Sequence, residues 1–424
     1  MPHRGHHHAL SPRRERATLL TLGALQFTHI LDFMIIMPLG AQLMSVFAIS
    51  PAQFAHLVAA YGLSAAVSGL AGGFVLDRFD RKRALVWLYA GFGLATLACA
   101  LAPSHHALLL ARIAAGAFGG LTGSLVNAMV GDIIPPARRG RAMSLVMTAF
   151  PLASVLGVPI GLVLAGKSGW HAPFFLLSGC TAGALALAAL VLPPIETAVS
   201  RHQPLRQMRE ILTDHVYQRA LALGAVLVMA GGLLIPFIAP AFIANVGLDE
   251  KIQLPITYMV GGLTTALTTP LIGWLSDHMN RLKLLMIMSV GAVIAVLVIT
   301  RMGPASLTFA SLMMALFMVT MSGRFSPVMT MITNAVGARH RGGFMSVHAA
   351  LQQAATAGVC LTAGFFVTRT PEGQLAGLPM LSYVSIACFI LTVILAAGLC
   401  SVAPHVASPA ASLLDPATPP PAPR

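Results

Sequence analysis

The sequence predicts an all-α integral membrane protein in which twelve helices cross the bilayer. Three observations predict this: of the 424 residues, 57% are hydrophobic, only 9% are charged, and the mean hydropathy is +0.81. A soluble domain has nearer a quarter of its residues charged, so this chain could not cover a globular surface with polar groups. The composition therefore excludes a soluble protein and favours a chain dissolved in lipid.

Twelve apolar runs are long enough to span a bilayer, which needs roughly 20 residues. The third and ninth runs are the shortest, and the tenth is long enough to tilt or kink. In order, the runs cover 17–43, 51–76, 84–102, 106–131, 142–165, 173–192, 220–243, 254–275, 282–300, 305–334, 343–367 and 380–402.

The basic residues are distributed asymmetrically between the loops. Of the 26 Lys and Arg residues, 20 fall in segments on the side of the N-terminus, 4 fall on the other side, and Arg112 and Arg324 lie within runs. The positive-inside rule then predicts that both termini are cytoplasmic. The net charge of +13 is explained by this topology. The charges form short clusters without interleaved aromatic residues, so we expect no nucleic-acid partner.

The runs divide the chain into two bundles of six helices. We expect a cytoplasmic N-terminal tail at 1–16, a first bundle at 17–192, a linker at 193–219, a second bundle at 220–402 and a disordered Pro-rich tail at 403–424. Within the linker, the stretch LRQMREIL has its apolar residues on or near one helical face. It predicts a helix that lies at the cytoplasmic membrane interface.

An internal echo supports two pseudo-symmetric halves. The second run ends in GFVLDRFDRKR at 73–83, and the eighth ends in GWLSDHMNRLK at 273–283. Both read Gly-x-x-x-Asp followed by basic residues, and both follow the second run of a set of six. A duplicated six-helix unit explains this placement.

In these motifs the sequence resembles the major facilitator superfamily, and within it the twelve-spanner drug:proton antiporters. The loop after the second run matches the signature Gly-x-x-x-Asp-Arg-x-Gly-Arg-basic, except that Asp80 stands where the signature has Gly. The segments GDIIPPARRGRAM and RGGFMSVHAALQQ are also typical of the family. The signature residues are Gly73, Asp77, Arg78, Arg81 and Lys82.

Two further helices carry the resemblance. The fourth run resembles the motif Arg-x-x-x-Gly-x-x-x-Gly, in which small residues four apart let two helices approach closely. The fifth resembles the antiporter motif in its Gly-x-Pro-x-Gly form, whose proline removes a backbone hydrogen bond and bends the helix. This bend either gates one end of a cavity or is a static kink. The residues are Arg112, Gly116 and Gly120, and Gly157, Pro159 and Gly161.

The resemblance implies a conformational latch at the loop after the second run. Asp77 would meet the N-terminus of a neighbouring helix in one conformation only, and so hold the outward-facing state. Asp132 is a candidate partner for Arg81. The alternative is that these residues are solvated charges that only set the topology, because an exposed ion pair contributes little.

A carboxylate stands in the first apolar run, within LQFTHILDFMIIMPLG. Inserting an ionised Asp32 there costs about 2.5–3.5 kcal/mol, so the side chain should face a cavity, find a partner or carry a proton. Arg112 is the natural partner, because both residues lie in the same half of the bilayer and the resemblance places both helices beside the central cavity. The pair either breaks in one state to couple proton and substrate, or permanently fixes two helices.

Other polar residues lie within the runs. His29 is one turn from Asp32 and could join a proton path with Gln26, although hydrogen bonding between helices is the alternative for each. Arg324 could bind an anionic group of a substrate, or equally bond backbone carbonyls or reach the interface.

The sequence thus predicts a proton-coupled secondary transporter of the inner membrane that exports small molecules or drugs by alternating access. Its partners would be a small-molecule substrate, protons and the lipid bilayer, and the resemblance implies a monomer. An importer or facilitator of sugars or other metabolites is the alternative. HExxH and GxSxG are missing, so we expect no enzyme. We also expect no cofactor or metal, since the five cysteines show no CxxC spacing.

Overall fold

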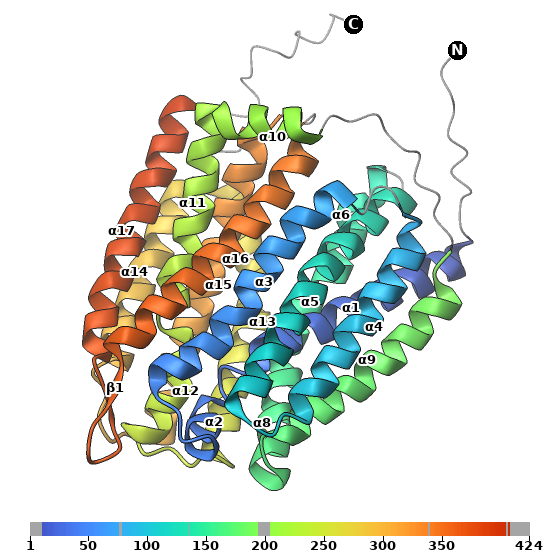
Figure 1. Cartoon of the computed structure of the whole chain (residues 1–424). Coiled ribbons are helices and arrows are strands. Elements are labelled where there is room, and N and C mark those ends of the chain that lie inside the picture. Colours follow the sequence, from blue (N-terminus) through green and yellow to red (C-terminus); the bar gives the residue numbers. More distant parts are fainter. Residues whose placement is uncertain are drawn as a thin grey trace, which may run out of the picture.

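The computed structural model describes residues 11–75, 79–134, 136–193, 204–337, 340–403 and 406–407, and this part of the chain is almost entirely helical (Figure 1). The first half contains α1 (Pro12–Ile35), α2 (Gly40–Val46), α3 (Pro51–Val75), α4 (Arg81–Ala100), α5 (His105–Ile133), α6 (Pro136–Met147), α7 (Ala149–Leu152), the π-helical turn η2 (Ala153–Gly157), α8 (Val158–Ser168) and α9 (His171–Val191). The linker contains α10 (Pro204–Thr213). The second half contains α11 (His215–Gly232), α12 (Ile235–Ala244), α13 (Gln253–His278), α14 (Arg281–Ile299), α15 (Leu307–Ala335), α16 (Arg341–Phe366), the paired strands β1 (Thr368–Arg369) and β2 (Leu375–Ala376), and α17 (Leu378–Val402).

Within the described residues, ten helical segments are both long and apolar enough to cross a membrane. Two more long helices, α13 and α16, have 26 residues each. At 1.5 Å per residue each measures about 39 Å, which exceeds the roughly 30 Å of a bilayer core. They match the predicted eighth and eleventh spans and carry polar residues, which lowers their hydropathy. The all-α fold is as predicted, and its long helices are consistent with twelve spans.

Corresponding helices of the two halves begin in the same way. The first, third and fourth long helices of each half have a side chain at the N-cap that accepts a hydrogen bond from a backbone N–H in the first turn, which satisfies a donor that the helix leaves free. Asp80, the departure from the family signature, accepts from Arg83 N at 2.7 Å. The capping pairs are Ser11 and Asp214, Asp80 and Asn280, and Ser104 and Ser306.

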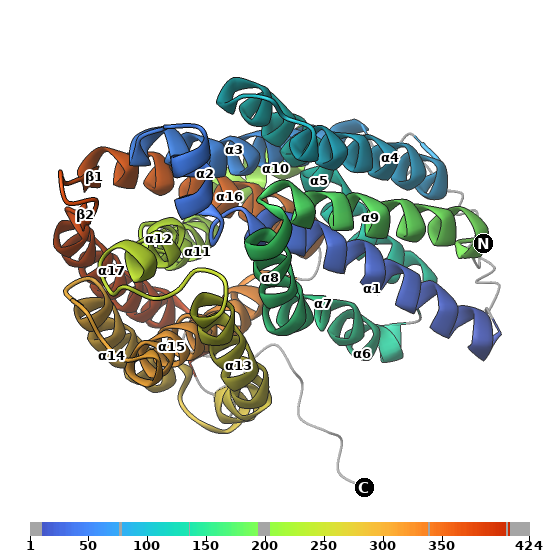
Figure 2. The same ribbon diagram turned by 90° about the horizontal axis from the view of Figure 1, so that it is seen from below.

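The bundle has two distinct ends. We call one the α10 end, because α10 and the end of α17 lie there. The other, with the β1–β2 hairpin, α2 and α12, is the hairpin end (Figures 1 and 2). The predicted first span is interrupted near the hairpin end, where α1 ends at Ile35 and α2 begins at Gly40. Pro38 lies in this turn, and it has no backbone N–H to continue a helix.

The buried apolar residues form one core at the hairpin end and two separate cores at the α10 end. The shared core joins the last turns of α1 and the first turns of α3 to α12 and to the last turns of α16. Towards the α10 end, one cluster contains only residues of the first half, and another contains only α10 and the second half. The two halves are therefore fastened together at the hairpin end and separate towards the α10 end.

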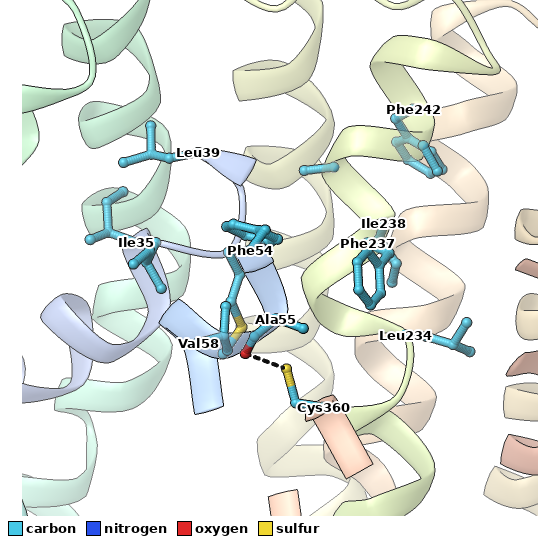
Figure 3. Packing of buried hydrophobic residues seen from close by; sticks show 14 of the residues in the cluster. Ile35, Leu39, Phe54, Ala55, Val58, Leu234, Phe237, Ile238, Phe242 and Cys360 are labelled. Atoms are coloured by element: carbon cyan, nitrogen blue, oxygen red, sulfur yellow. Dashed lines mark hydrogen bonds between the residues drawn. The ribbon is translucent and has the colours of Figure 1, made fainter. Parts of the chain in front are cut away.

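Close packing across the halves is visible in the shared core (Figure 3). The rings of Phe54 and Phe237 meet edge to face with centroids 6.4 Å apart, and the Cys360 thiol donates to the Ala55 carbonyl oxygen at 3.6 Å. Here α3 runs beside α16, where a Cβ on Gly62 would lie 3.2 Å from the Ala357 Cβ.

A second contact across the halves joins α13 to the broken fifth span. A Cβ added to Gly262 of α13 would lie 2.9 Å from the Ser154 carbonyl oxygen in η2. Backbone therefore meets backbone at this crossing, which only a residue without a side chain allows.

The linker contains the helix that the sequence predicts. In α10, Ile211 is 1% exposed and belongs to the core of the second half, and Glu210 lies 3.1 Å from His340 at the start of α16. The linker helix is thus attached to the second half. Residues 1–10 of the predicted N-terminal tail lie outside the described residues, and α1 already begins at Pro12. Most of the predicted Pro-rich C-terminal tail also lies outside the described residues.

The spacing Gly116-x-x-x-Gly120 places α5 directly against α3. A Cβ on Gly116 would contact the Tyr61 carbonyl oxygen and the Ser64 hydroxyl, and one on Gly120 would lie 2.6 Å from the Ala65 carbonyl oxygen. Small residues let these two helices approach closely, as expected for helices in lipid.

Gly116→Ala should therefore destabilise the first half, by about 1–3 kcal/mol, because the new methyl group meets backbone that cannot move aside cheaply. Thermal unfolding of the detergent-solubilised protein would measure this. Gly183→Ala in α9 is the matched control, because a Cβ there meets nothing within 4 Å. Equal melting temperatures for the two variants would contradict the proposed packing.

Candidate functional site

The two charges that the sequence places in the first and fourth spans meet in the interior. Arg112 Nη1 of α5 lies 2.8 Å from Asp32 Oδ2 of α1, and both side chains are 0% exposed. The same nitrogen donates to the Asp32 carbonyl oxygen at 3.1 Å. Thr96 of α4 donates its hydroxyl to Asp32 Oδ1 at 3.3 Å. The carboxylate thus has one charged and one neutral hydrogen-bond partner, which offsets part of the cost of burying it.

The guanidinium of Arg112 is only partly used. Its Cζ lies 4.5 Å from the centre of the Tyr61 ring, a cation–π contact with α3. Its Nε and Nη2, like the Tyr61 hydroxyl, have no hydrogen-bond partner among the described residues. An arginine offers five N–H donors, so this one retains donors for water or a ligand.

Gln26 and His29 lie on α1, about two turns and one turn before Asp32 respectively. The His29 ring lies between Tyr61 and Phe92, with centroids 6.3 and 5.9 Å away. Neither of its nitrogens, nor Gln26 Oε1, has a hydrogen-bond partner within the described part of the chain. The structure therefore brings four predicted residues of the first half together: Gln26, His29, Asp32 and Arg112.

Arg324 lies apart from this group, in the second half. Its Nη2 donates to the Thr392 hydroxyl at 3.3 Å and its Cζ lies 4.3 Å from the centre of the Phe389 ring, both on α17. The side chain is almost fully buried. No carboxylate among the described residues forms an ion pair with it, so a hydroxyl and an aromatic face compensate the charge.

The structure describes part of the predicted latch. Arg81 Nε, at the start of α4, lies 2.6 Å from Asp132 Oδ2 at the end of α5. The two side chains are 16% and 37% exposed, so the pair itself contributes little to stability. Gly73 belongs to the last turns of α3, whereas Asp77 and Arg78 lie outside the described residues.

The predicted bend motif packs directly behind Asp32. The turn η2, which ends at Gly157, and Pro159 in the first turn of α8 interrupt the fifth span. A Cβ on Gly157 would lie 2.7 Å from a Leu31 methyl group, and one on Gly161 would contact Ile35. The irregular helix therefore packs against the stretch of α1 that carries Asp32.

Two partners of the central pair were not singled out from the sequence. Thr96 is one of many threonines in apolar runs, and nothing in its spacing marks it. Tyr61 is an isolated aromatic residue on α3, and only the tertiary arrangement places its ring against Arg112.

Removing one partner of the buried pair should cost more than removing both. Arg112→Met would leave the Asp32 charge uncompensated and lower the free energy of unfolding by about 3–5 kcal/mol, whereas the double variant with Asp32→Asn would recover most of that loss. Chemical unfolding of the four proteins in detergent would measure the coupling.

The exposed pair of Arg138 and Glu15, with an Nη1–Oε1 distance of 2.9 Å and Arg138 61% exposed, supplies the control cycle. Its coupling should stay under about 1 kcal/mol. If the coupling free energy of Asp32 and Arg112 is no larger than that of this exposed pair, the two buried charges do not form the ion pair that the structure shows.

The sequence is similar to known membrane transporters. The model of the Major Facilitator Superfamily matches residues 22–360. The chain is 32% identical over 173 residues to the uncharacterized MFS-type transporter YceJ of Bacillus subtilis, covering 41% of this chain and 44% of that protein. It is 31% identical over 156 residues to the multidrug resistance protein B homolog of Mycobacterium tuberculosis, covering 37% and 29% respectively. The alignments thus span less than half the length of these relatives.

Solved transporters share the fold over nearly the whole chain. A bacterial homolog of the human lysosomal transporter Spinster, in an inward-facing and occupied conformation, superposes with a TM-score of 0.71 at 17% identity, covering 94% of this chain and 98% of that one. A D-xylose-proton symporter superposes with a TM-score of 0.72 at 16% identity, covering 91% and 97%. Since the family model covers most of the sequence and these transporters share its fold, this multi-pass membrane protein is a member of the Major Facilitator Superfamily.

Proposed function

We propose that the protein is a proton-coupled exporter of small molecules or drugs, in which Asp32 carries the proton and Arg112 is its alternating partner. The observation that carries this proposal is the ion pair at 2.8 Å between two side chains that are both 0% exposed. A carboxylate and a guanidinium at this depth are expensive to bury, and a hydrophobic replacement is often no less stable. Charged groups inside a membrane more often mark an ion or substrate pathway.

The pair supplies a two-state element. When Asp32 is ionised it holds Arg112, and α1 and α5 are tied together. When Asp32 takes up a proton it loses its negative charge, and Arg112 loses the partner that compensated it. The guanidinium then favours an anionic group or water elsewhere. Protonation and pairing therefore exclude one another, and this is what coupling requires of a carrier.

The distribution of apolar cores supports alternating access. The shared core closes the hairpin end, while the halves have separate cores at the α10 end. The sequence assigns 20 of the 26 basic residues to loops on one side of the bilayer, the side of the linker that contains α10, and the positive-inside rule assigns that side to the cytoplasm. On this orientation the structure is the inward-facing state, with Asp32 paired and its proton already released. The inner membrane of a bacterium is the location that fits the bacterial relatives.

Export is favoured by the fifth span. Its Gly157-x-Pro159-x-Gly161 motif resembles that of antiporters, and it packs against the turn of α1 that bears Asp32. The multidrug resistance protein B homolog is one of the similar sequences, which agrees with this direction. The Arg81–Asp132 pair would belong to the conformational latch on the cytoplasmic side. In the second half, Arg324 would bind an anionic group of the substrate. We take a monomer as the working unit.

Asp32→Asn should abolish energised export. Cells that lack their own efflux pumps would be tested with a panel of fluorescent and antibiotic compounds, with and without a protonophore. Wild type should lower accumulation of at least one compound, and the protonophore should remove this effect. Cells with Asp32→Asn should resemble empty-vector cells, because the amide cannot carry the proton.

Glu372→Gln is the matched control for that experiment. Glu372 is an exposed carboxylate next to the β1–β2 hairpin, and its loss should leave export unchanged. Undiminished, protonophore-sensitive export by Asp32→Asn would contradict the proposed coupling. If wild type changes the accumulation of no compound in the panel, an importer or facilitator of metabolites becomes the better reading.

The orientation has its own test. Green fluorescent protein fused after the C-terminus should fluoresce, and alkaline phosphatase at the same position should be inactive, because both report a cytoplasmic location. The opposite pair of results would place the α10 end outside, and would reverse the inward-facing assignment.

A further inference from the structure

The buried pair has no direct exchange with solvent in this conformation. Both Asp32 and Arg112 are 0% exposed, and the α1 residues on either side of the carboxylate, Leu31 and Ile35, belong to the shared core that closes the hairpin end. A proton that leaves Asp32 towards the α10 end must therefore pass through the interior of the first half.

A line of polar groups runs in that direction along α1. Gln26, His29 and Asp32 are spaced three residues apart, and residues at this spacing are neighbours on one face of a helix, with Cβ atoms about 5–6 Å apart. The His29 ring packs against α3, α4 and α5. Gln26 is 8% exposed and His29 is partly exposed, so the line leads from the sealed carboxylate to less completely buried polar groups.

The same groups are the ones that lack protein partners. Gln26 Oε1, both ring nitrogens of His29, the Tyr61 hydroxyl, and Arg112 Nε and Nη2 are all buried without a hydrogen bond to any described residue. Buried polar atoms are nearly always satisfied by protein or by ordered water. A run of adjacent unsatisfied atoms is therefore a place where water completes the hydrogen bonds.

A glycine leaves room for such water. A Cβ added to Gly123 of α5 would lie 3.6 Å from His29 Cε1, 3.9 Å from His29 Nδ1 and 4.0 Å from Gln26 Oε1. The space in front of Gly123 thus adjoins two polar atoms that both need a partner. Gly119, one turn earlier, faces the Tyr61 hydroxyl and the His29 ring, so at these two positions α5 presents no side chain to His29.

We propose that His29 is the proton relay of the first half, which passes the Asp32 proton through water at Gly123 to Gln26 and the α10 end. This inference rests on the proposed function and adds a residue to it. The Asp32 carboxyl gives its proton, directly or through one water, to one ring nitrogen of a neutral His29. The other nitrogen then releases its proton to the water at Gly123. Asp32, now a carboxylate, pairs with Arg112, and the imidazole is neutral again in its other tautomer.

The surroundings of His29 suit a relay. The titratable and charged groups near it in the first half are Asp32 on α1, Tyr61 on α3, Tyr89 on α4 and Arg112 on α5. Tyr89 is bound to the Thr28 hydroxyl, and Arg112 is held by Asp32. None of them donates to or accepts from the imidazole, so both ring nitrogens remain available for transfer.

The experiment follows the protonation of Asp32 itself, and so needs no substrate. The purified full-length protein would be given a rapid jump in pH, and the infrared band of its protonated carboxyl would be followed in time. Asp32→Asn assigns the band. In His29→Gln the band should reach the same final amplitude at a rate at least about ten-fold lower, because a positioned proton carrier has been removed.

Two further variants make the test specific. Gly123→Ala should also slow the band at unchanged amplitude, since its methyl group occupies the space between His29 and Gln26 and meets those atoms at ordinary contact distances. If thermal unfolding shows that His29→Gln does not fold, the rate measured in Gly123→Ala still tests the relay. His56→Gln on α3 removes an exposed histidine instead, and should leave rate and amplitude unchanged.

Each outcome is informative. Wild-type rates in both His29→Gln and Gly123→Ala, with a band that Asp32→Asn removes, would overturn the relay and leave the proposed coupling residue intact. The absence of any band that depends on Asp32 would overturn the proposed function itself. A lower final amplitude in His29→Gln, with an unchanged rate, would assign the histidine a structural role and reject the relay.

Discussion

The compensation of one buried negative charge organises the first half of this transporter. Asp32 requires a cation and hydrogen-bond donors in an environment where water is scarce, and they come from different helices, with Arg112 on α5 and Thr96 on α4. Tyr61 on α3 then covers the guanidinium. Four helices are thereby held in register by one carboxylate, and the glycines of α5 let α3 come close enough to take part. The second half has no such centre among its described residues, because Arg324 is compensated by a hydroxyl and an aromatic ring.

The fold was largely predictable, because apolar length and basic loops report directly on the bilayer. The positions of the long helices follow the predicted runs, and the repeated loop motif correctly indicated two related halves. Its unexplained Asp80 has a local role as the N-cap of α4, matched by Asn280 in the second half. The interruptions were harder to predict. The turn at Pro38 changes the helix path without changing its hydrophobicity, so a composition argument cannot detect it. The π-helical η2 lies at the bend that only the Gly157-x-Pro159-x-Gly161 motif indicated.

For the site, the sequence predicted which charges lie at the same depth but not which way they turn. Depth along a helix follows from counting residues, and this brings Asp32 and Arg112 to one level. The rotation of each helix about its axis decides everything else. It turns Arg324 towards α17, places Thr96 and Tyr61 at the pair, and leaves His29 facing the glycines of α5. Those rotations depend on packing between helices that are distant in the sequence.

The contacts between the two halves have a mechanical consequence. Where α3 meets α16 and where α13 meets η2, the touching groups are glycine, alanine and main chain, as at Gly62 with Ala357 and Gly262 with Ser154. Large side chains of two packed helices interdigitate, and sliding one helix past the other then forces them out of their preferred rotamers. Helix surfaces made of small residues have no interdigitating side chains. Relative movement of the two halves would therefore displace fewer side chains from their rotamers at these crossings than at the aromatic contacts of the shared core.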